Sequence, residues 1–173
     1  MEMEDYNIEI IRRKYQLVPR TLIFIEKDEK ILTLCKQKRN SFGFGKLNGI
    51  GGHIEQGEEP FESAKREIME EANIQVKNLD LSAILFIDIG DCPGVEVFVF
   101  KAEYFSGEAR DSEEGHLEWM TRAEIKKRPN TVKDLDFLIE LVHRHTPNST
   151  PAIVKYSYDK DEQLRIDVYS EKE

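Results

Sequence analysis

The chain has 173 residues, of which 39% are hydrophobic and 34% charged, and its formal net charge is −9. This length fits one globular domain, and the ordinary composition excludes collagen-like and largely disordered classes. The acidic balance opposes tight binding to a nucleic-acid polymer, where neutralised phosphates supply most of the affinity. It does not oppose binding of a single nucleotide, because a divalent metal can carry positive charge to the phosphates.

Two cysteines, Cys35 and Cys92, are too few for a disulfide framework. Cys35 lies in an apolar run and is expected to be a small core residue. Residues 1–15 are charged throughout and lack the apolar segment of a signal peptide. Because no apolar run is long enough to cross a bilayer, we expect a cytoplasmic protein without a membrane partner. The sequence leaves the oligomeric state open.

The first half of the chain predicts two strands and one helix. Residues 21–25 and 31–35 favour strands joined across a charged turn. A glycine-rich segment, 41–57, follows. Apolar residues then recur at helical spacing over 61–72, and Pro60 suits the first turn of that helix.

The second half adds strand-like runs at 81–89 and 95–104. Thr121 and Glu124 match a capping box, which predicts a short helix ended by Pro129.

The C-terminal third predicts another helix and a hairpin. A helical apolar stripe covers 135–142, before Pro147, and the runs 152–158 and 164–169 read as two paired strands. Strands alternating with few helices predict an α+β or α/β sandwich, in which helices cover a mixed sheet.

Three carboxylates of the first helix share one face. Glu67, Glu70 and Glu71 stand at i, i+3 and i+4. A solvated acidic surface would show the same spacing. Clustered carboxylates also suit Mg²⁺, which prefers oxygen ligands and keeps water and phosphate in its shell. The glycine-rich segment directly before the helix favours the metal interpretation, because glycine permits close approach of the backbone.

Residues 52–74, GHIEQGEEPFESAKREIMEEANI, resemble the Nudix box, G-x5-E-x7-R-E-U-x-E-E-x-G-U, where U is aliphatic. The single departure is Asn73, which stands at the second glycine. That glycine follows a helix end, often in the left-handed conformation, and asparagine is the next most tolerated residue there. The departure therefore affects helix termination and not chemistry.

Resemblance extends outside the box. The stretch 36–58 is similar to that of MutT-type, oxidised-purine nucleoside triphosphatases, and 152–169 resembles a terminal hairpin of some bacterial members. The resemblance implies a Nudix-type α/β/α sandwich with a mixed sheet and a C-terminal β-hairpin. It implies a single domain over 18–173, preceded by an extension, 1–17, of unknown role.

The resemblance also implies a metal site and its chemistry. Mg²⁺, with Mn²⁺ as a substitute, would be bound by Glu67, Glu70, Glu71 and the carbonyl of Gly51. The ions would bridge phosphate oxygens and lower the pKa of an attacking water. Arg66 completes the catalytic set and is expected to hold a glutamate by a charge-assisted contact. Which glutamate acts as general base stays open.

A further metal or base residue is expected in a later loop. Glu114 lies five residues before Trp119, where relatives carry such a glutamate. Its neighbours Glu113 and Glu118 leave the register open, and a plain surface charge is the alternative. We expect Trp119 to pack under the helix that follows it.

Two residues resemble base-contacting positions of the oxidised-purine enzymes. Asn48 matches an asparagine that hydrogen-bonds the nucleobase, and Asp134 aligns with an acidic residue that reads the purine edge. The alternatives are a loop-bracing amide and a helix-start carboxylate favoured by the helix dipole. Relatives place a stacking tryptophan near this acid, whereas Thr131 and Val132 stand here, so base preference is expected to be altered or loosened. The remaining expected substrate contacts are Phe42 in the pocket, Lys38 and His53 at phosphate, Gly52 and Thr21.

The leading hypothesis is a Mg²⁺-dependent pyrophosphohydrolase, of the 8-oxo-dGTP diphosphatase kind. It would convert a purine nucleoside triphosphate, oxidised purines included, to a nucleoside monophosphate and inorganic diphosphate (pyrophosphate). A second hypothesis keeps the box but assigns an unmodified nucleoside triphosphate, a nucleotide sugar or a capped RNA end. A third is a catalytically silent domain that senses a nucleotide. The intact set of glutamates opposes the third.

Overall fold

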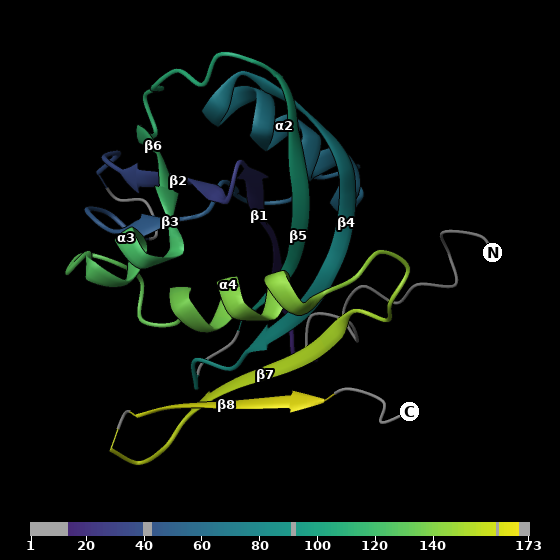
Figure 1. The fold of residues 1–173 in the computed structure, drawn as a ribbon. Helices are drawn as coiled ribbons and strands as arrows, with labels where there is room; N and C mark the ends of the chain where they lie inside the picture. Colours follow the sequence, from purple (N-terminus) through teal and green to yellow (C-terminus); the bar gives the residue numbers. More distant parts are fainter. Residues whose placement is uncertain (1–13, 40–42, 91–92, 162, 170–173) are drawn as a thin grey trace, which may run out of the picture.

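The computed structural model describes residues 14–39, 43–90, 93–161 and 163–169. Within them the strands form one eight-stranded sheet in the order β3-β2-β1-β5-β4-β7-β8, with β6 paired to β2 (Figure 1). The elements in chain order are β1 (Leu17–Lys27), β2 (Lys30–Lys36), β3 (Leu47–Asn48), α2 (Pro60–Ala72), β4 (Ile74–Ile87), β5 (Gly94–Gly107), β6 (Gly115–Thr121), α3 (Arg122–Lys127), α4 (Leu135–Arg144), β7 (Ala152–Tyr158) and β8 (Leu164–Tyr169).

The sheet is mixed, as the sequence predicts. β1 runs parallel to β5, and β4 runs parallel to β7, whereas β1 and β2, β4 and β5, and β7 and β8 pair antiparallel. The predicted C-terminal hairpin is therefore present, with β8 outermost (Figure 1).

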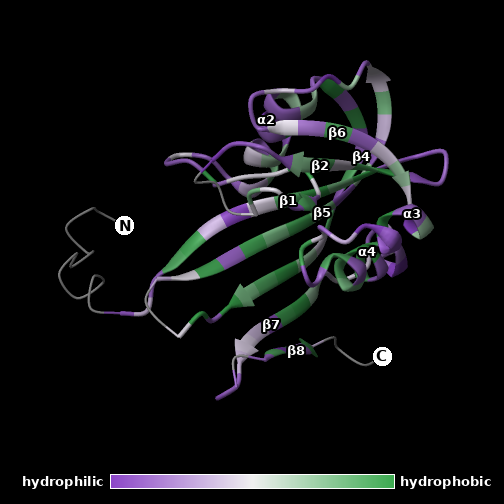
Figure 2. Ribbon diagram, turned by 90° about the vertical axis from the view of Figure 1, so that its left-hand side faces the viewer, coloured by the Kyte–Doolittle hydropathy of each residue, from purple (hydrophilic) through white to green (hydrophobic). Residues whose placement is uncertain are grey.

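Two apolar layers lie on the two faces of the sheet. Alternate residues of a strand point to opposite faces, so Leu22 and Phe24 join the layer under α4, whereas Ile23 and Ile25 join the layer under α2. The apolar residues that fill these layers appear as green bands along the strands in Figure 2. Helices thus cover both faces, which confirms the expected sandwich.

The structure contains two strands that the sequence did not predict. β3 has only two residues, and β6 carries no strict alternation that separates it from a loop. β6 pairs along the whole of β2. It directs Trp119 to the α2 layer, where its ring lies 5.8 Å from that of Tyr104. The expectation that Trp119 packs under the following helix is therefore wrong, because Ile125 of that helix belongs to the opposite layer.

The remaining helix boundaries agree with the sequence. The capping box of Thr121 and Glu124 is present, and α3 has its C-cap at Arg128, directly before Pro129. Within the described residues, no helix is long and apolar enough to span a membrane. The boundary between an extension, 1–17, and a domain, 18–173, stays a prediction, because residues 1–13 lie outside the described ranges.

Candidate active site

Helix α2 carries the expected carboxylates beside its buried stripe. Ala64, Ile68 and Ala72 pack into the layer under the helix. Glu67 and Glu71 flank that stripe and are only 8% and 3% exposed, whereas Glu70 is exposed to solvent. The three carboxylates therefore share a side of the helix but differ in burial.

Both ends of α2 are fixed by local hydrogen bonds. Glu59 is the N-cap, and its carboxylate accepts from the backbone N–H groups of Phe61 and Glu62. At the other end Asn73 has φ 52° and ψ 40°, and its N–H donates to the carbonyls of Ile68 and Met69. The predicted left-handed C-cap is thereby confirmed.

The loop before α2 runs against β1, which brings its backbone close to the glutamates. Thr21 N donates to Gly52 O at 2.9 Å. A Cβ at Gly51 would lie 2.2 Å from the carbonyl oxygen of Thr21, and a Cβ at Gly52 would lie 2.3 Å from Glu67 Oε1. Gly51 has no room for a side chain, because the obstacle is backbone and its φ is +146°, whereas a side chain at Gly52 would have to displace the Glu67 carboxylate.

Glu71 connects helix, loop and sheet. Its Oε2 accepts from Gly51 N at 2.8 Å. Lys36, the last residue of β2, places Nζ 3.3 Å from Glu71 Oε1 and 3.1 Å from the carbonyl oxygen of Gly51. Burial raises the pKa of Glu71, and the Lys36 ammonium and the Gly51 N–H oppose that rise.

Arg66 makes the expected charge-assisted contacts. Its Nε and Nη2 bind both carboxylate oxygens of Glu58 at 2.6 and 2.9 Å. Its Nη1 reaches Glu67 Oε1 at 2.9 Å and Glu70 Oε2 at 3.0 Å. Arg66 lowers the pKa of Glu58 to about 2 and opposes the rise that burial causes in the pKa of Glu67. The guanidinium therefore orients three carboxylates.

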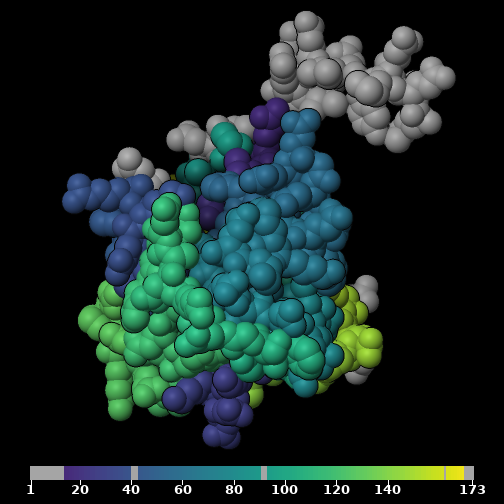
Figure 3. Space-filling view, turned by 90° about the horizontal axis from the view of Figure 1, so that it is seen from above, coloured from purple at the N-terminus to yellow at the C-terminus, as the bar shows by residue number. Residues whose placement is uncertain are grey.

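A hollow of about 800 Å³ opens between α2, the loop before it and the loop before β6. In Figure 3 the blue and teal atoms of α2 and the segment before it adjoin the green atoms that follow β5. The expected residues that line it are Lys38, Gly51, Gly52, His53, Arg66, Glu67, Glu70, Glu71 and Glu114. Residues from four separate segments are thus brought to one surface.

The loop before β6 supplies the expected fourth glutamate. Glu114 O accepts from Gln37 N at 2.8 Å, and the Glu114 carboxylate pairs with Lys38 Nζ. Glu118 pairs instead with Arg128 and does not line the hollow. The geometry therefore favours Glu114 over Glu118 for the position that the sequence left open; Glu113 also lines the hollow.

His53 lies on the cationic side of the hollow. Its Nε2 is 3.2 Å from Arg20 Nη1. Burial lowers the pKa of His53, and the charges of Arg20 and Lys36 lower it further. A neutral imidazole whose Nε2 accepts from the guanidinium carries its proton on Nδ1, and that N–H can donate one hydrogen bond to a phosphate.

The residues around the hollow provide the oxygen donors that a hard divalent cation prefers. Within the described part of the chain, however, no three carboxylate, imidazole or thiol side chains already converge as a metal cage. The site that fits best combines a backbone carbonyl, Gly51 O, with the Glu71 carboxylate, because an ammonium already binds those two oxygens.

The expected base-contacting residues lie apart from this hollow. Leu47 N donates to Asn130 O at 2.8 Å, which ties β3 to the segment before α4. Asn48 is half-buried, and its Oδ1 accepts from Gly49 N at 2.8 Å. Asp134 stands at the N-cap of α4 but makes no side-chain cap bond. Neither residue lines the hollow.

Thr21, another expected substrate residue, lies on β1 beside the loop that carries Gly52. The Thr21 side chain is 3% exposed, and its hydroxyl has no hydrogen-bond partner in the described part of the protein. Burial, and then the Asp134 carboxylate, raises the pKa of Tyr156 from the terminal hairpin. Asp134 thus faces another strand and is not used to cap its own helix. Phe42 lies outside the described residues.

Sequence reasoning missed Lys36 and Arg20, which both line the hollow. A signal for Lys36 was present. Leu32 and Leu34 are fully buried in the layer under α2, and Lys36 continues their alternation. A lysine on the buried face of a strand is costly unless it is paired, so its partner must come from α2 or its loop.

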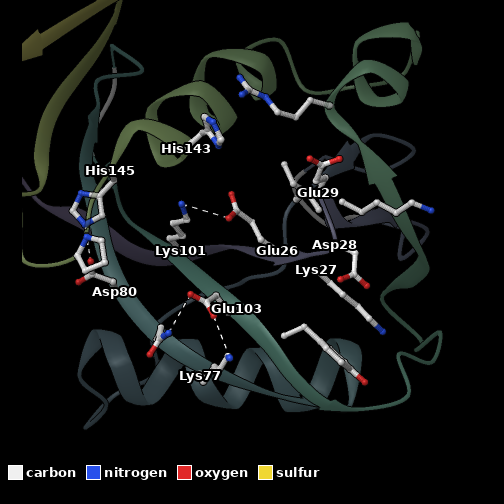
Figure 4. A pocket seen from close by; sticks show the side chains of 16 residues that line it. Glu26, Lys27, Asp28, Glu29, Lys77, Asp80, Lys101, Glu103, His143 and His145 are labelled. Atoms are coloured by element: carbon white, nitrogen blue, oxygen red, sulfur yellow. Dashed lines mark hydrogen bonds and ion pairs between the residues drawn. The ribbon is translucent and has the colours of Figure 1, made fainter.

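A second hollow of about 780 Å³ lies at the opposite end of β2 (Figure 4). Its charges neutralise one another: Lys101 pairs with Glu26 and Lys77 with Glu103, each at 3.4 Å. None of the residues expected from the sequence lines it. The charged hollow beside α2 is therefore the candidate active site.

A mixed sheet covered on both faces, with a glycine loop and a glutamate-rich helix at one end, is the arrangement expected of a Nudix domain. The NUDIX domain family model matches residues 16–141. The chain belongs to this family.

Similar proteins agree with this class. An oxidized purine nucleoside triphosphate hydrolase of Danio rerio is 33% identical over 57% of this chain and 63% of that protein. One of Mus musculus is 31% identical over 61% and 67%. The chain thus spans about two thirds of the length of these relatives. A solved MutT protein of Bacillus halodurans superposes with a TM-score of 0.68 at 26% identity, covering 88% of this chain and 97% of that one.

Proposed function

We propose that the protein is a Mg²⁺-dependent pyrophosphohydrolase of a purine nucleoside triphosphate, oxidised purines included. Water would attack one phosphorus of the anhydride between the α- and β-phosphates, the bond from that phosphorus to the bridging oxygen would break, and the products would be a nucleoside monophosphate and inorganic pyrophosphate, which share the protons of the water. The observation that carries the proposal is the joining of Gly51, Glu67 and Glu71, with Arg66, at one hollow. The names of the two animal relatives support the purine substrate.

Metal binding and the orientation of its ligands are assigned to different residues. Gly51 O, Glu67, Glu70, Glu71 and Glu114 would hold the metal. A bound divalent ion supplies positive charge to the phosphate oxygens and lowers the pKa of the attacking water. Arg66 keeps Glu67 and Glu70 in place by short contacts to both. In-line substitution at phosphorus needs little else from the protein than orientation and charge.

The phosphates would meet the cationic part of the hollow. Lys38 and His53, the expected phosphate contacts, line the hollow, and Arg20 and Lys36 add two cations. This charge matches a triphosphate, which a chain of net charge −9 would otherwise repel. The same cations would serve a nucleotide sugar or a capped RNA end, so those substrates are the alternative.

A screen of nucleotides with Mg²⁺ tests the proposal. The wild-type protein is incubated with 8-oxo-dGTP, dGTP, dATP and a nucleotide sugar, and released pyrophosphate, orthophosphate and nucleoside monophosphate are measured separately. We expect pyrophosphate from the purine triphosphates. Release of nucleoside monophosphate from the sugar alone would establish the alternative, and no turnover of any compound would favour a nucleotide sensor.

A further inference from the structure

Lys36 stands where the chain is expected to bind a metal. Its side chain is buried, at the end of β2 and on the face covered by α2. The Nζ atom lies 3.1 Å from Gly51 O and 3.3 Å from Glu71 Oε1. Both oxygens belong to the expected ligand set, so one cation of the protein itself already binds them.

We propose that the Lys36 ammonium and the metal ion compete for Gly51 O and Glu71, so that metal binding displaces Lys36 from these oxygens. This inference rests on the proposed function in one respect: it takes Gly51 and Glu71 as metal ligands. It is independent of which nucleotide is cleaved.

The competition follows from the way Glu71 is held. Gly51 N donates to Glu71 Oε2 at 2.8 Å, so Oε1 is the oxygen that remains available on the Lys36 side. Mg²⁺ binds oxygen at about 2.0–2.1 Å. A divalent ion bound at Oε1 and at Gly51 O would therefore share both oxygens with the ammonium. A divalent ion that shares two oxygens with the ammonium lies close to it, and two neighbouring cations repel strongly in a buried site.

The displaced ammonium can remain in the same hollow. Lys36 lines the same hollow as Arg20 and Lys38. An ammonium that leaves Glu71 stays on the wall of that hollow, where phosphate oxygens can pair with it. Lys36 would thus neutralise Glu71 until a metal arrives and would then be available to the substrate.

Metal affinity without nucleotide tests the competition. Free Mn²⁺ is measured by electron paramagnetic resonance during titration of the wild-type protein, Lys36→Met and Lys30→Met. Lys30 lies at the other end of the same strand, so Lys30→Met removes the same charge away from the hollow. A charge within 4–6 Å changes the proton affinity of a carboxylate by about 10- to 1000-fold, and we expect Lys36→Met to bind Mn²⁺ at least about 10-fold more tightly. Lys30→Met should match the wild type.

The outcomes separate this inference from the proposed function. Equal or weaker Mn²⁺ binding by Lys36→Met overturns the competition, as does an equal gain in Lys30→Met. A third variant, Glu71→Gln, should bind Mn²⁺ more weakly than wild type. Unchanged Mn²⁺ affinity in Glu71→Gln would show that Glu71 is not a metal ligand. That result would contradict both its role in the proposed function and the competition with Lys36.

Lys36→Met leaves Glu71 buried without its cation and can fail to fold. The wild-type protein then provides the test. With ¹⁵N-labelled lysine, the ammonium resonance of Lys36 is identified by its loss in Lys36→Arg. We expect Mg²⁺ to shift this resonance and speed its hydrogen exchange, because the ammonium leaves its two oxygens. A resonance unchanged at saturating Mg²⁺ would contradict the proposal.

Discussion

Glu71 is the residue in which the contacts of the candidate site converge. It is 3% exposed and holds both the Gly51 N–H and the Lys36 ammonium. From the sequence alone, we would expect Glu71→Gln to relieve repulsion among the carboxylates of α2 and to leave the stability of the helix unchanged. The tertiary contacts reverse that expectation, because the charge has a buried partner.

For Glu71→Gln we therefore expect loss of turnover together with a moderate loss of stability. An amide keeps one acceptor but loses the charge opposite Lys36, which costs about 1–3 kcal/mol in the free energy of unfolding. Urea unfolding and pyrophosphate release measure the two effects. A folded Glu71→Gln protein that turns over near the wild-type rate would exclude this helix face from catalysis.

Glu58 gives the protein a defined response to acid. Its pKa falls from the ordinary 4.5 to about 2, chiefly because Arg66 binds it. A carboxyl with a lowered folded-state pKa stabilises the fold above its unfolded pKa, and that contribution is lost as the pH falls through the folded value. We expect the unfolding free energies of wild type and Glu58→Gln to converge between pH 4.5 and pH 2. A difference that stays constant over this window would show that the ion pair is not the cause.

At the scale of the element, α2 ends at a residue whose left-handed backbone conformation most residues avoid. Asn73 has φ 52°. Asn73→Gly should be neutral or stabilising, whereas Asn73→Val should cost about 1–2 kcal/mol, because a left-handed backbone brings Cβ against the carbonyl.

Gln75 provides the matched control for Asn73→Val. It lies two residues later in β4, exposed and extended, and its side chain accepts one exposed hydrogen bond from Ser106 Oγ, so Gln75→Val should change the unfolding free energy by no more than about 0.5 kcal/mol. Turnover per folded molecule should stay near wild type in all three variants. A large loss of rate in folded Asn73→Gly would reveal a chemical role for the amide.

At the scale of the whole molecule, the expected base-reading residues come from segments far apart in the chain. β3 carries Asn48, and its hydrogen bonds to residues 130 and 132 bring the start of α4 alongside. Asn48→Ala should lower kcat/KM for purine triphosphates about 5- to 150-fold, since it strands a hydrogen-bond partner at a cost of about 1–3 kcal/mol. Metal affinity should stay unchanged.

Asp134→Asn tests the same region differently, because an amide presents donors where the carboxylate presents only acceptors. We expect a changed ranking among 8-oxo-dGTP, dGTP and dATP. Asp136→Asn, on the exposed side of the same helix start, should leave the ranking as it is. A common factor for every substrate in both Asn48→Ala and Asp134→Asn would assign these residues to the fold alone.

The sequence by itself determined the features that depend on neighbours along the chain. Helical spacing and the box located α2, and a single asparagine at the second glycine position located its left-handed end, because both are properties of a few consecutive residues. The family followed from the same segment.

Only the tertiary structure decided the contacts between distant segments. The pairing of Lys36 with Glu71 joins residues 35 positions apart, and it depends on how the end of β2 meets the face of α2. Likewise β6, unpredicted from its own residues, is a strand because β2 offers it a partner along its length. Strand pairing and buried ion pairs are set by which surfaces meet, and local propensity does not encode that choice.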